Sequence, residues 1–257
     1  MLGSIIGDVI GSVFEFNPVK TTSFPLFCEV STFTDDTVLT IAVAKCILDD
    51  CEYVPTLKDF TLRYPGQGYG HHYYQWAISD NAHPYNSFGN GSAMRVSPVG
   101  FAFQSRSQVL VEAEKSAKIT HNHPEGIKGS QAVALAVYMA RQGESKGEIK
   151  HEINKVFGYD LSRTIEMIRP TYHFDVTCQG SVPEAIIAFL ESSNYEDAIR
   201  LSISLGGDAD TQACITGGIA EAFYKDIPSD IVEETRARLP EEFLTIIDRF
   251  RKKYLGL

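Results

Sequence analysis

Apolar residues along this chain recur mostly at the spacing of helices. Residues 37–48 are apolar enough for a buried helix, and residues 126–142 carry small and apolar side chains at helical spacing. The same reasoning predicts further helices over residues 107–119, 148–157, 181–193, 195–205, 211–224 and 229–255. Pro183 would lie in the first turn of its helix, where its missing N–H costs no hydrogen bond.

Strand signals are weak. Two short stretches rich in β-forming residues, Phe24–Phe33 and His173–Thr177, are isolated, and no hairpin signal flanks them. The longest stretch without helical spacing runs from about residue 64 to 100 and is dense in Gly, Asn, His and aromatic residues. A loop of that length inside a compact domain is usually functional. Because no linker and no internal repeat divides the chain, we expect one all-α domain over residues 1–257.

The composition is that of an ordinary globular protein, with 44% hydrophobic and 22% charged residues, and it excludes a disordered chain. The formal net charge is −10. A nucleic-acid binder needs a basic surface that displaces counterions, so no DNA or RNA partner is expected. An anionic small molecule would also be repelled, unless a bound cation or helix N-termini offset the charge.

The chain shows no targeting signal. No apolar run approaches the ~20 residues that a transmembrane helix needs. The apolar N-terminus lacks a basic segment and is interrupted by Asp8 and Glu15, which argues against a signal peptide. Five widely spaced cysteines without a CxxC pair suit free thiols in a reducing compartment. These features predict a cytoplasmic protein that does not associate with membranes.

Two acidic motifs stand where helices are predicted to begin: FTDDT over residues 33–37 and GGDADT over residues 206–211. Either motif alone has a structural explanation, because Asp and Thr are preferred N-caps and acidic first turns complement the helix dipole. Capping therefore remains an alternative for each motif taken separately.

Together the two motifs predict more than capping. If the apolar helices that they open pack side by side, four carboxylates converge: Asp35, Asp36, Asp208 and Asp210. Like charges a few Å apart raise one another's pKa and destabilise the fold unless a cation neutralises them. Oxygen ligands without Cys or His favour Mg²⁺, Mn²⁺ or Ca²⁺ over zinc. Two divalent ions would balance four carboxylates and would also attract an anionic substrate.

Glycine-rich segments supply candidate binding loops. The segment GNGSAMR over residues 89–95 offers backbone N–H groups to phosphate or ribose oxygens. The GxGxG over residues 66–70 follows no strand and is interpreted as a flexible loop. His71 and His72 are interpreted as surface or packing residues rather than ligands, and Arg95 as the partner of a structural carboxylate.

These motifs resemble those of a known family. In order, the chain carries GSIIGDVIGSVFE, FTDDT, GNGSAMRVSP, THNHPEGIKGSQA and SLGGDADTQACITGGIAEA, which closely resemble the ADP-ribosylglycohydrolases, the dinitrogenase-reductase-activating-glycohydrolase-like family. The matches span residues 3 to about 224, and TDDT with a distant GGDxDT is highly specific. The resemblance implies a single compact all-α domain, an orthogonal helical bundle with a binuclear Mg²⁺ cleft. It also implies hydrolysis of the glycosidic bond that joins ADP-ribose to a protein side chain or small acceptor.

The resemblance also carries functional residues over to this chain. Two Mg²⁺ ions, or Mn²⁺ in their place, would be held by Thr34, Asp35, Asp36, Asp208, Asp210 and Thr211. Asp210 is the expected bridge between the two ions. The acid–base candidates are Asp35, Asp36 and Glu15, and the sequence leaves open which of them has the main role.

Substrate contacts follow from the same resemblance. The residues expected to bind ADP-ribose are Asn86, Ser87, Phe88, Gly89, Asn90, Gly91, Ser92, Met94 and His121. Phe88 is placed to stack on adenine where some relatives have tyrosine, so stacking is kept and a hydroxyl is lost. An acidic residue matching Glu15 is characteristic of members that cleave O-linked ADP-ribose, which favours an O-linked substrate, although many bacterial-type relatives cleave ADP-ribosyl-arginine.

Other functions remain open at this stage. The substrate could be a free ADP-ribose conjugate, such as O-acetyl-ADP-ribose, or another N-glycoside. A non-catalytic, crystallin-like or binding member would be expected to lose metal ligands, and all six matching positions are kept here. The expected partner is an ADP-ribosylated protein or a small ADP-ribose conjugate, and a monomer is expected. The sequence does not specify the acceptor linkage or the modified target.

Overall fold

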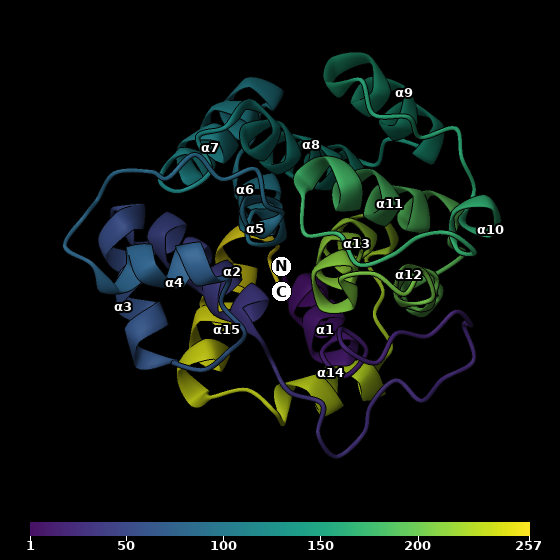
Figure 1. Ribbon diagram of the computed structural model, residues 1–257, viewed down its shortest axis with the longest axis horizontal. Coiled ribbons are helices and arrows are strands. Elements are labelled where there is room, and N and C mark those ends of the chain that lie inside the picture. The colour runs from purple at the N-terminus through teal and green to yellow at the C-terminus, as the bar shows by residue number, and fades with distance from the viewer.

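The computed structural model describes all residues, 1–257, as an assembly of helices without a sheet (Figure 1). An isolated antiparallel bridge joins Gly89 and Thr177, and neither β-rich stretch forms a strand. In chain order the helices are α1 (Leu2–Gly11), α2 (Asp35–Asp49), α3 (Tyr53–Arg63), α4 (His71–Ile78), α5 (Gly91–Met94), α6 (Ser97–Ala102), α7 (Arg106–Lys118), α8 (Pro124–Gln142), α9 (Lys146–Phe157), α10 (Ile165–Ile168), α11 (Cys178–Glu191), α12 (Tyr195–Ile203), α13 (Ala209–Tyr224), α14 (Ser229–Arg236) and α15 (Glu241–Tyr254). The all-α prediction is confirmed. None of these helices combines the length and apolar character that a bilayer crossing requires.

Most of the predicted helices occur close to their expected bounds, as α2, α7, α8, α9, α11, α12 and α13. The single helix predicted over residues 229–255 is wrong, because the structure divides it into α14 and α15. The break lies at Pro240, which occupies the N-cap position of α15. Proline lacks the N–H that a continuous helix needs and disfavours helical geometry in the residue before it, so one helix does not run through this position.

The helix around Pro183 begins earlier than predicted. Thr177 caps α11 by accepting a hydrogen bond from the backbone N–H of Gly180 at 3.1 Å, so the helix starts at Cys178. Pro183 therefore lies inside α11 and not in its first turn. The proline is buried, as are the residues on either side of it, and this packing offsets the hydrogen bond that it cannot donate.

The prediction of a non-helical stretch from about residue 64 to 100 is also wrong, because α4, α5 and α6 lie within it. Buried aromatic side chains account for α4. Tyr73 and Trp76 are 6% and 4% exposed, and their ring centroids lie 5.6 Å apart. Packing of these rings stabilises a helix whose glycine- and histidine-rich surroundings show little helical pattern, because tertiary contacts outweigh weak local propensity.

Helix α1 was not among the predicted helices, and its glycines explain why. Gly3, Gly7 and Gly11 recur at every fourth position, and glycine is a poor helix former. In the structure this row of glycines faces α13, where a Cβ on Gly7 would overlap the carbonyl oxygen of Ala213. A Cβ on Gly11 would lie 2.5 Å from the Cα of Asp210. The glycines therefore let the two helix backbones touch beside the second acidic motif.

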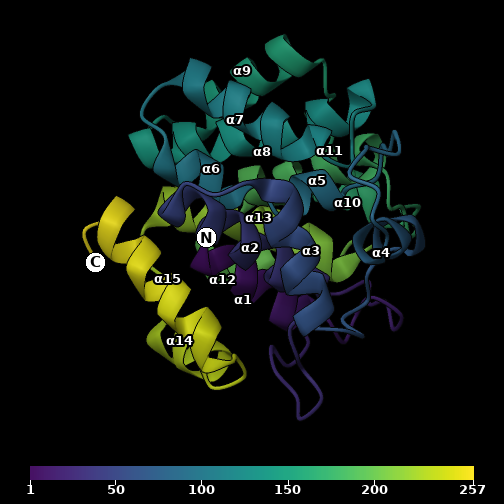
Figure 2. The same ribbon diagram turned by 90° about the vertical axis from the view of Figure 1, so that its left-hand side faces the viewer.

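One hydrophobic cluster of 67 buried residues extends through the molecule. Helix α13 lies within it and contacts α1, α8, α11 and α12. Figures 1 and 2 show α1 and α13 in the interior, with α14 and α15 along one flank and α9 on the outer side of α8. Both α2 and α13 pack against α1. This common support brings the acidic N-terminal turns of α2 and α13 together.

Gly7→Ala is expected to destabilise the protein by about 1–3 kcal/mol or to prevent folding, because the added methyl group would push α1 away from α13. Gly147→Ala is a matched control, since Gly147 lies in α9 and its Cβ would meet only the Ser145 hydroxyl, at 3.9 Å. The control should be neutral or stabilising by up to ~1 kcal/mol. Urea unfolding measures both variants, and equal stabilities would contradict the close contact of α1 with α13.

Candidate active site

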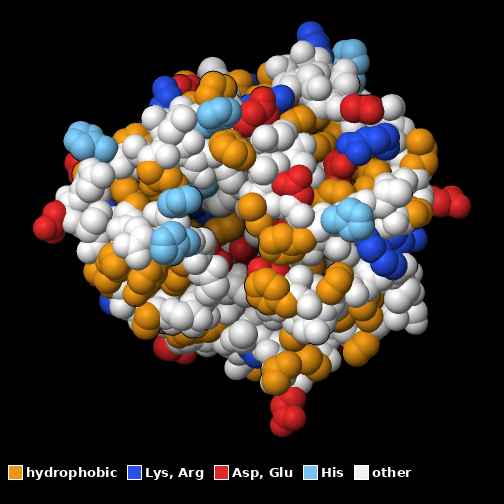
Figure 3. Space-filling view, viewed as in Figure 1, with side chains coloured by type: hydrophobic (Ala, Val, Ile, Leu, Met, Phe, Trp, Pro, Cys, Tyr) orange, Lys and Arg blue, Asp and Glu red, His pale blue; other side chains and the backbone are white.

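A cavity of about 330 Å³ opens where the N-terminal ends of α2 and α13 face the glycine-rich segment 87–91. Figure 3 shows acidic side chains at the bottom of a central hollow, with hydrophobic and histidine side chains around it. The acidic residues that line the cavity are Glu15, Asp35, Asp36, Asp208 and Asp210. The two acidic motifs therefore converge on one cavity, as their sequences predict.

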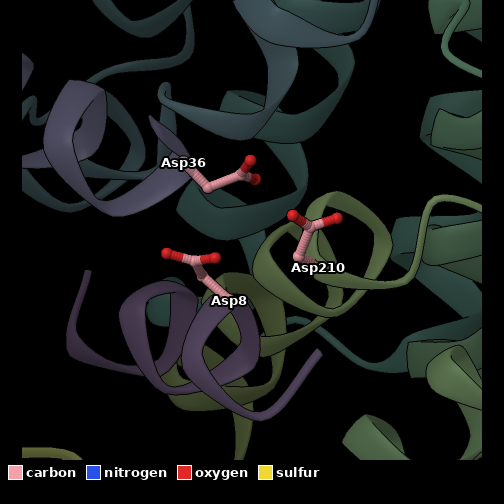
Figure 4. A group of neighbouring side chains, drawn as sticks. All are labelled: Asp8, Asp36 and Asp210. Atoms are coloured by element: carbon pink, nitrogen blue, oxygen red, sulfur yellow. The ribbon is translucent and has the colours of Figure 1, made fainter. Parts of the chain in front are cut away.

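The carboxylates form two groups that share one member. One oxygen each from Asp8, Asp36 and Asp210 lie within 4.8 Å of one another, and the same holds for Glu15, Asp208 and Asp210. In Figure 4 the first three side chains point toward one another from α1, α2 and α13. Asp210 belongs to both groups, which is the position that a residue bridging two cations would need.

Asp8 is the member of the cluster that sequence reasoning missed. Its carboxylate is fully buried and accepts four hydrogen bonds, from the backbone N–H and the hydroxyl of both Thr34 and Thr37, at 2.5–3.1 Å. Three of these donors contact Oδ2 and one contacts Oδ1, so Oδ1 keeps a free lone pair. Asp8 therefore fixes the first turn of α2 against α1. The signal in the sequence was an aspartate inside an apolar helix, because a buried aspartate needs partners.

The capping interpretation holds for one acidic motif and not for the other. At α2 the Thr34 hydroxyl accepts a hydrogen bond from the backbone N–H of Asp36 at 3.3 Å. At α13 Asp208 occupies the N-cap position, but its side chain makes no capping bond. Its Oδ2 instead accepts a hydrogen bond from Nδ2 of Asn90 at 2.7 Å. The Asp208 carboxylate thus interacts across the cavity and not with its own helix.

The site has the properties of a cation site. No lysine or arginine forms an ion pair with these aspartates, and burial together with neighbouring carboxylates raises the pKa of Asp35, Asp36 and Asp210 well above the ordinary value. Oδ2 of Asp36 accepts a hydrogen bond from the Thr211 hydroxyl at 3.1 Å, whereas its Oδ1 is buried without any partner. Such an unpaired oxygen among like charges suits a hard divalent cation. The residues present therefore fit a metal.

The raised pKa values make the stability of the metal-free protein depend on pH. A carboxyl group with a raised pKa binds its proton more tightly in the folded state, so its contribution to stability is lost as the pH rises through that pKa. The pKa of Asp208 is about 6 and that of Glu15 about 7. In chelator, the melting temperature is expected to fall as the pH rises from about 4 to 7. Millimolar Mg²⁺ should raise the melting temperature most at the higher pH, because a cation that binds only the folded, deprotonated site would stabilise it.

The control for this pH series is the same protein with Mg²⁺ present throughout, where the dependence on pH should be smaller. A melting temperature that does not respond to any divalent ion, or that rises with pH in chelator, would contradict the presence of repelling carboxylates at this site.

Glu15 reaches the cavity from a turn. Helix α1 ends at Gly11, and the turn that follows it brings the Glu15 side chain to the cavity. The half-buried carboxylate has its pKa raised to about 7 by burial and by the charges of Asp210 and Asp8. In the metal-free protein it is therefore partly protonated at neutral pH, which is what a proton donor requires.

Backbone hydrogen bonds hold the glycine-rich segment beside the cavity. The N–H of Asn90 donates to the carbonyl of Val176 at 2.7 Å, and the N–H of Cys178 donates to the carbonyl of Phe88 at 2.9 Å. Of the residues predicted to bind substrate, those that line the cavity are Ser87, Gly89, Asn90, Gly91, Met94 and His121.

The other three predicted binding residues lie outside this lining. Ser92 is fully buried and donates its hydroxyl proton to the carbonyl of Gly126 at 2.7 Å. Asn86 donates its backbone N–H to Oδ1 of Asn122 at 2.8 Å. Phe88 is 45% exposed, and its ring centroid lies 5.3 Å from that of His123. Their contacts with substrate stay predictions.

Further residues at the cavity were not expected there. Tyr85 lines it, and so do His71 and His72, which are exposed, as predicted for surface residues. Arg95 also lines the cavity and is fully buried. Its predicted pairing with a carboxylate is wrong, because it forms no ion pair and its hydrogen-bond acceptors are neutral. Tyr85, His71 and His72 lie outside the motifs, whereas Arg95 ends the GNGSAMR segment, where the sequence favours a structural role.

Known proteins share these features. The sequence profile described as ADP-ribosylglycohydrolase matches residues 1–255. ADP-ribosylhydrolase ARH3 of Xenopus tropicalis is 29% identical over 87% of this chain and 85% of the relative. The Homo sapiens protein of the same name is 27% identical over 87% and 84%, respectively. ADP-ribosylarginine hydrolase Tri1 of Pseudomonas putida strain GB-1 is 24% identical over 91% of this chain and 72% of the relative.

A solved structure resembles the whole fold. The ADP-ribosylglycohydrolase-related protein complex matches with a TM-score of 0.73 and 23% identity, over 97% of this chain and 95% of that chain. At this level of identity the likeness concerns the fold, and it confirms the helical architecture that the sequence motifs imply. The family profile covers almost the entire sequence. The chain therefore belongs to the ADP-ribosylglycohydrolase family, whose members are glycohydrolases.

Proposed function

We propose that this protein is a divalent-cation-dependent hydrolase that cleaves the glycosidic bond between ADP-ribose and a modified protein side chain. One observation carries the proposal: two clusters of carboxylate side chains, with Asp210 in both, lie at the same cavity as the glycine-rich segment 89–91. The carboxylates suit a cation, and the backbone of the segment suits nucleotide oxygens. The printed names of the relatives, ADP-ribosylhydrolase and ADP-ribosylarginine hydrolase, agree with this substrate class.

The proposed cofactor is a pair of Mg²⁺ ions, with Mn²⁺ as a substitute. Their proposed ligands are Thr34, Asp35, Asp36, Asp208, Asp210 and Thr211. Bound cations would supply Lewis-acid chemistry, by orienting the distal ribose and lowering the pKa of a water molecule. Asp8 would support the ligands on α2, because its hydrogen bonds to Thr34 and Thr37 fix the first turn of that helix.

The glycine-rich segment is proposed to bind the adenosine and diphosphate. The absence of side chains at Gly89 and Gly91 leaves the backbone open to the cavity, and a Cβ on Gly91 would lie 3.2 Å from Nε2 of His121. The exposed ring of Phe88 is the proposed stacking partner of adenine. Asn90 is kept in place by its hydrogen bond to Asp208, which links the nucleotide side of the cavity to the acidic side.

The proposed reaction breaks the bond at the anomeric carbon of the distal ribose through a transition state with oxocarbenium character. The leaving group needs a proton, and Glu15 is positioned to donate one at the acidic end of the cavity. Asp35 lines the same cavity, and its carboxylate makes no hydrogen bond to another side chain. Asp35 and Asp36 are the other acid–base candidates. The proton of the attacking water passes to one of these carboxylates.

The test is a panel of ADP-ribose conjugates linked to arginine, serine and glutamate peptides, together with nucleotide-linked ADP-ribose and O-acetyl-ADP-ribose. Each is incubated with the purified protein in Mg²⁺ or in chelator, and free ADP-ribose is measured by chromatography. Release from at least one peptide linkage in Mg²⁺, and background release in chelator, is expected. Release from O-acetyl-ADP-ribose alone would indicate a hydrolase of free conjugates, and binding without any release would indicate a non-catalytic member.

A further inference from the structure

Arg95 is a buried cation without an acidic partner. It follows α5 directly, is fully buried and lines the cavity. Its Nη2 donates hydrogen bonds to the carbonyl of Ser116 at 3.0 Å and to the hydroxyl of Thr120 at 2.9 Å. Because a guanidinium group has donors and no acceptor, the Thr120 oxygen must be the acceptor in this contact. The direction of this hydrogen bond is therefore fixed.

The Thr120 hydroxyl has one further partner, Nδ1 of His121, at 2.7 Å. Thr120 is fully buried, and its hydroxyl makes no hydrogen bonds besides those to Arg95 and His121. If Nδ1 carried a proton, the hydroxyl proton would be left buried without an acceptor, which is unfavourable. The hydroxyl therefore donates to Nδ1, and Nδ1 is the unprotonated nitrogen of the ring.

The charge state of His121 agrees with this direction. Burial and the nearby positive charge of Arg95 hold the pKa of His121 well below its usual value, so the ring is neutral at physiological pH. A neutral imidazole carries one proton. Since Nδ1 is an acceptor, that proton is on Nε2.

The Nε2 atom faces the glycine-rich segment. An ideal Cβ would lie 3.2 Å from Nε2 if built on Gly91 and 3.7 Å if built on Gly89. His121 lines the cavity with these glycines, and its Nε2 has no hydrogen-bond acceptor within the protein. A donor at this place is available to an oxygen atom of a ligand that lies along the segment.

We infer that Arg95 and Thr120 are positioning residues that fix His121 in the tautomer protonated at Nε2, so that the neutral ring donates a hydrogen bond to an oxygen of ADP-ribose bound at Gly89–Gly91. This inference rests on the proposed function, which supplies the ligand. The same three residues would bind a ligand nitrogen or oxygen that accepts a hydrogen bond and would disfavour one that only donates. They thus make Nε2 of His121 a hydrogen-bond donor to the ligand.

The first test reads the tautomer without any ligand. Nuclear magnetic resonance of protein labelled with ¹⁵N-histidine distinguishes protonated from unprotonated ring nitrogens. For His121 near neutral pH the expected result is an unprotonated Nδ1 and a protonated Nε2. The opposite tautomer, or a ring protonated at both nitrogens, would overturn the inference. Because this measurement uses the wild-type protein, it does not depend on whether a variant folds.

The second test compares Thr120→Val with Thr120→Ser. Valine has the shape of threonine without its hydroxyl, so His121 loses the partner of Nδ1 and becomes free to exchange tautomers. ADP-ribose binding, measured by calorimetry, is expected to weaken about tenfold, as for the loss of one ligand hydrogen bond. Serine keeps the hydroxyl and should restore both the wild-type tautomer and the affinity.

Equal affinity of the valine and serine variants, or an unchanged His121 tautomer in Thr120→Val, would overturn the positioning role. Failure of the wild-type protein to bind ADP-ribose in Mg²⁺ would instead overturn the proposed function, and with it the identity of the ligand, while the resonance measurement would still decide the tautomer.

Discussion

Asp210→Asn is expected to lower the rate of ADP-ribose release by about 10³-fold or more, as the loss of several kcal/mol of metal-derived transition-state stabilisation implies. Asp210 belongs to both clusters of carboxylate side chains, so this substitution alters both proposed cation sites at once. Asparagine keeps the size of the side chain and an oxygen that can accept the hydrogen bond from the backbone N–H of Thr211. The fold is therefore expected to survive, as circular dichroism would show.

The stability of Asp210→Asn separates a metal ligand from a structural residue. If Asp210 only complemented the dipole of α13, its neutralisation would lower the free energy of unfolding by up to ~1 kcal/mol and leave turnover intact. If Asp210 is instead one of several carboxylates that repel one another, its neutralisation removes repulsion. In chelator, Asp210→Asn should then be as stable as the wild type or more stable. Asp226→Asn is the control, because Asp226 is exposed and does not line the cavity. Wild-type turnover in Asp210→Asn would favour the structural explanation.

Glu15→Gln is expected to slow release from serine-linked ADP-ribose by about 10²-fold or more and to change release from the arginine linkage little. A serine side chain leaves as a poor, basic alkoxide unless it is protonated as the bond breaks, so a positioned acid contributes greatly. A guanidine leaving group is more readily accommodated without one. Glutamine keeps the shape of the side chain and removes its acidic proton. Initial rates on matched serine- and arginine-linked peptides give the comparison.

Glu29→Gln is a suitable control for this substitution, since Glu29 is exposed and does not line the cavity. If Glu15→Gln keeps the wild-type rate on both linkages, Glu15 has no role as an acid. An equal loss on both linkages would place Glu15 among the groups that support the cations, next to Asp208 and Asp210, and would also contradict linkage-specific catalysis.

The acidic site is predictable because its chemistry is concentrated in two continuous motifs. FTDDT and GGDADT each stand directly before a strongly apolar stretch, and a stretch of that kind has to be buried. The structure places both motifs at the beginnings of buried helices, α2 and α13, on one cavity. Local sequence thus determines where these carboxylates lie along the chain, and hydrophobic burial brings them together.

Residues whose role depends on distant partners were harder to predict. Asp8 is defined by hydrogen bonds to Thr34 and Thr37, 26 and 29 positions away. Arg95 was assigned a carboxylate partner because a buried charge normally has one, yet its acceptors are a carbonyl and a hydroxyl. Such pairings become visible only once the packing of the helices is known.

The prediction of helix boundaries failed for two opposite reasons. Glycine at every fourth position weakens the helical signal of α1 in the sequence, although the same glycines allow its close contact with α13. At Pro240 the periodicity of the apolar residues continues, so the break between α14 and α15 was overlooked in favour of one long helix. In the first case tertiary contact outweighs propensity, and in the second a local breaker outweighs periodicity.

Two divalent cations are proposed to bind in this cavity around Asp210. Calorimetric titration of Mg²⁺ or Mn²⁺ into the metal-free protein tests this binding, with Asp226→Asn and Asp210→Asn measured beside the wild type. The predicted result is two bound ions per chain for the wild type and for Asp226→Asn, and loss of this binding in Asp210→Asn. Absence of binding to the wild type, or binding that Asp210→Asn leaves unchanged, would contradict the claim.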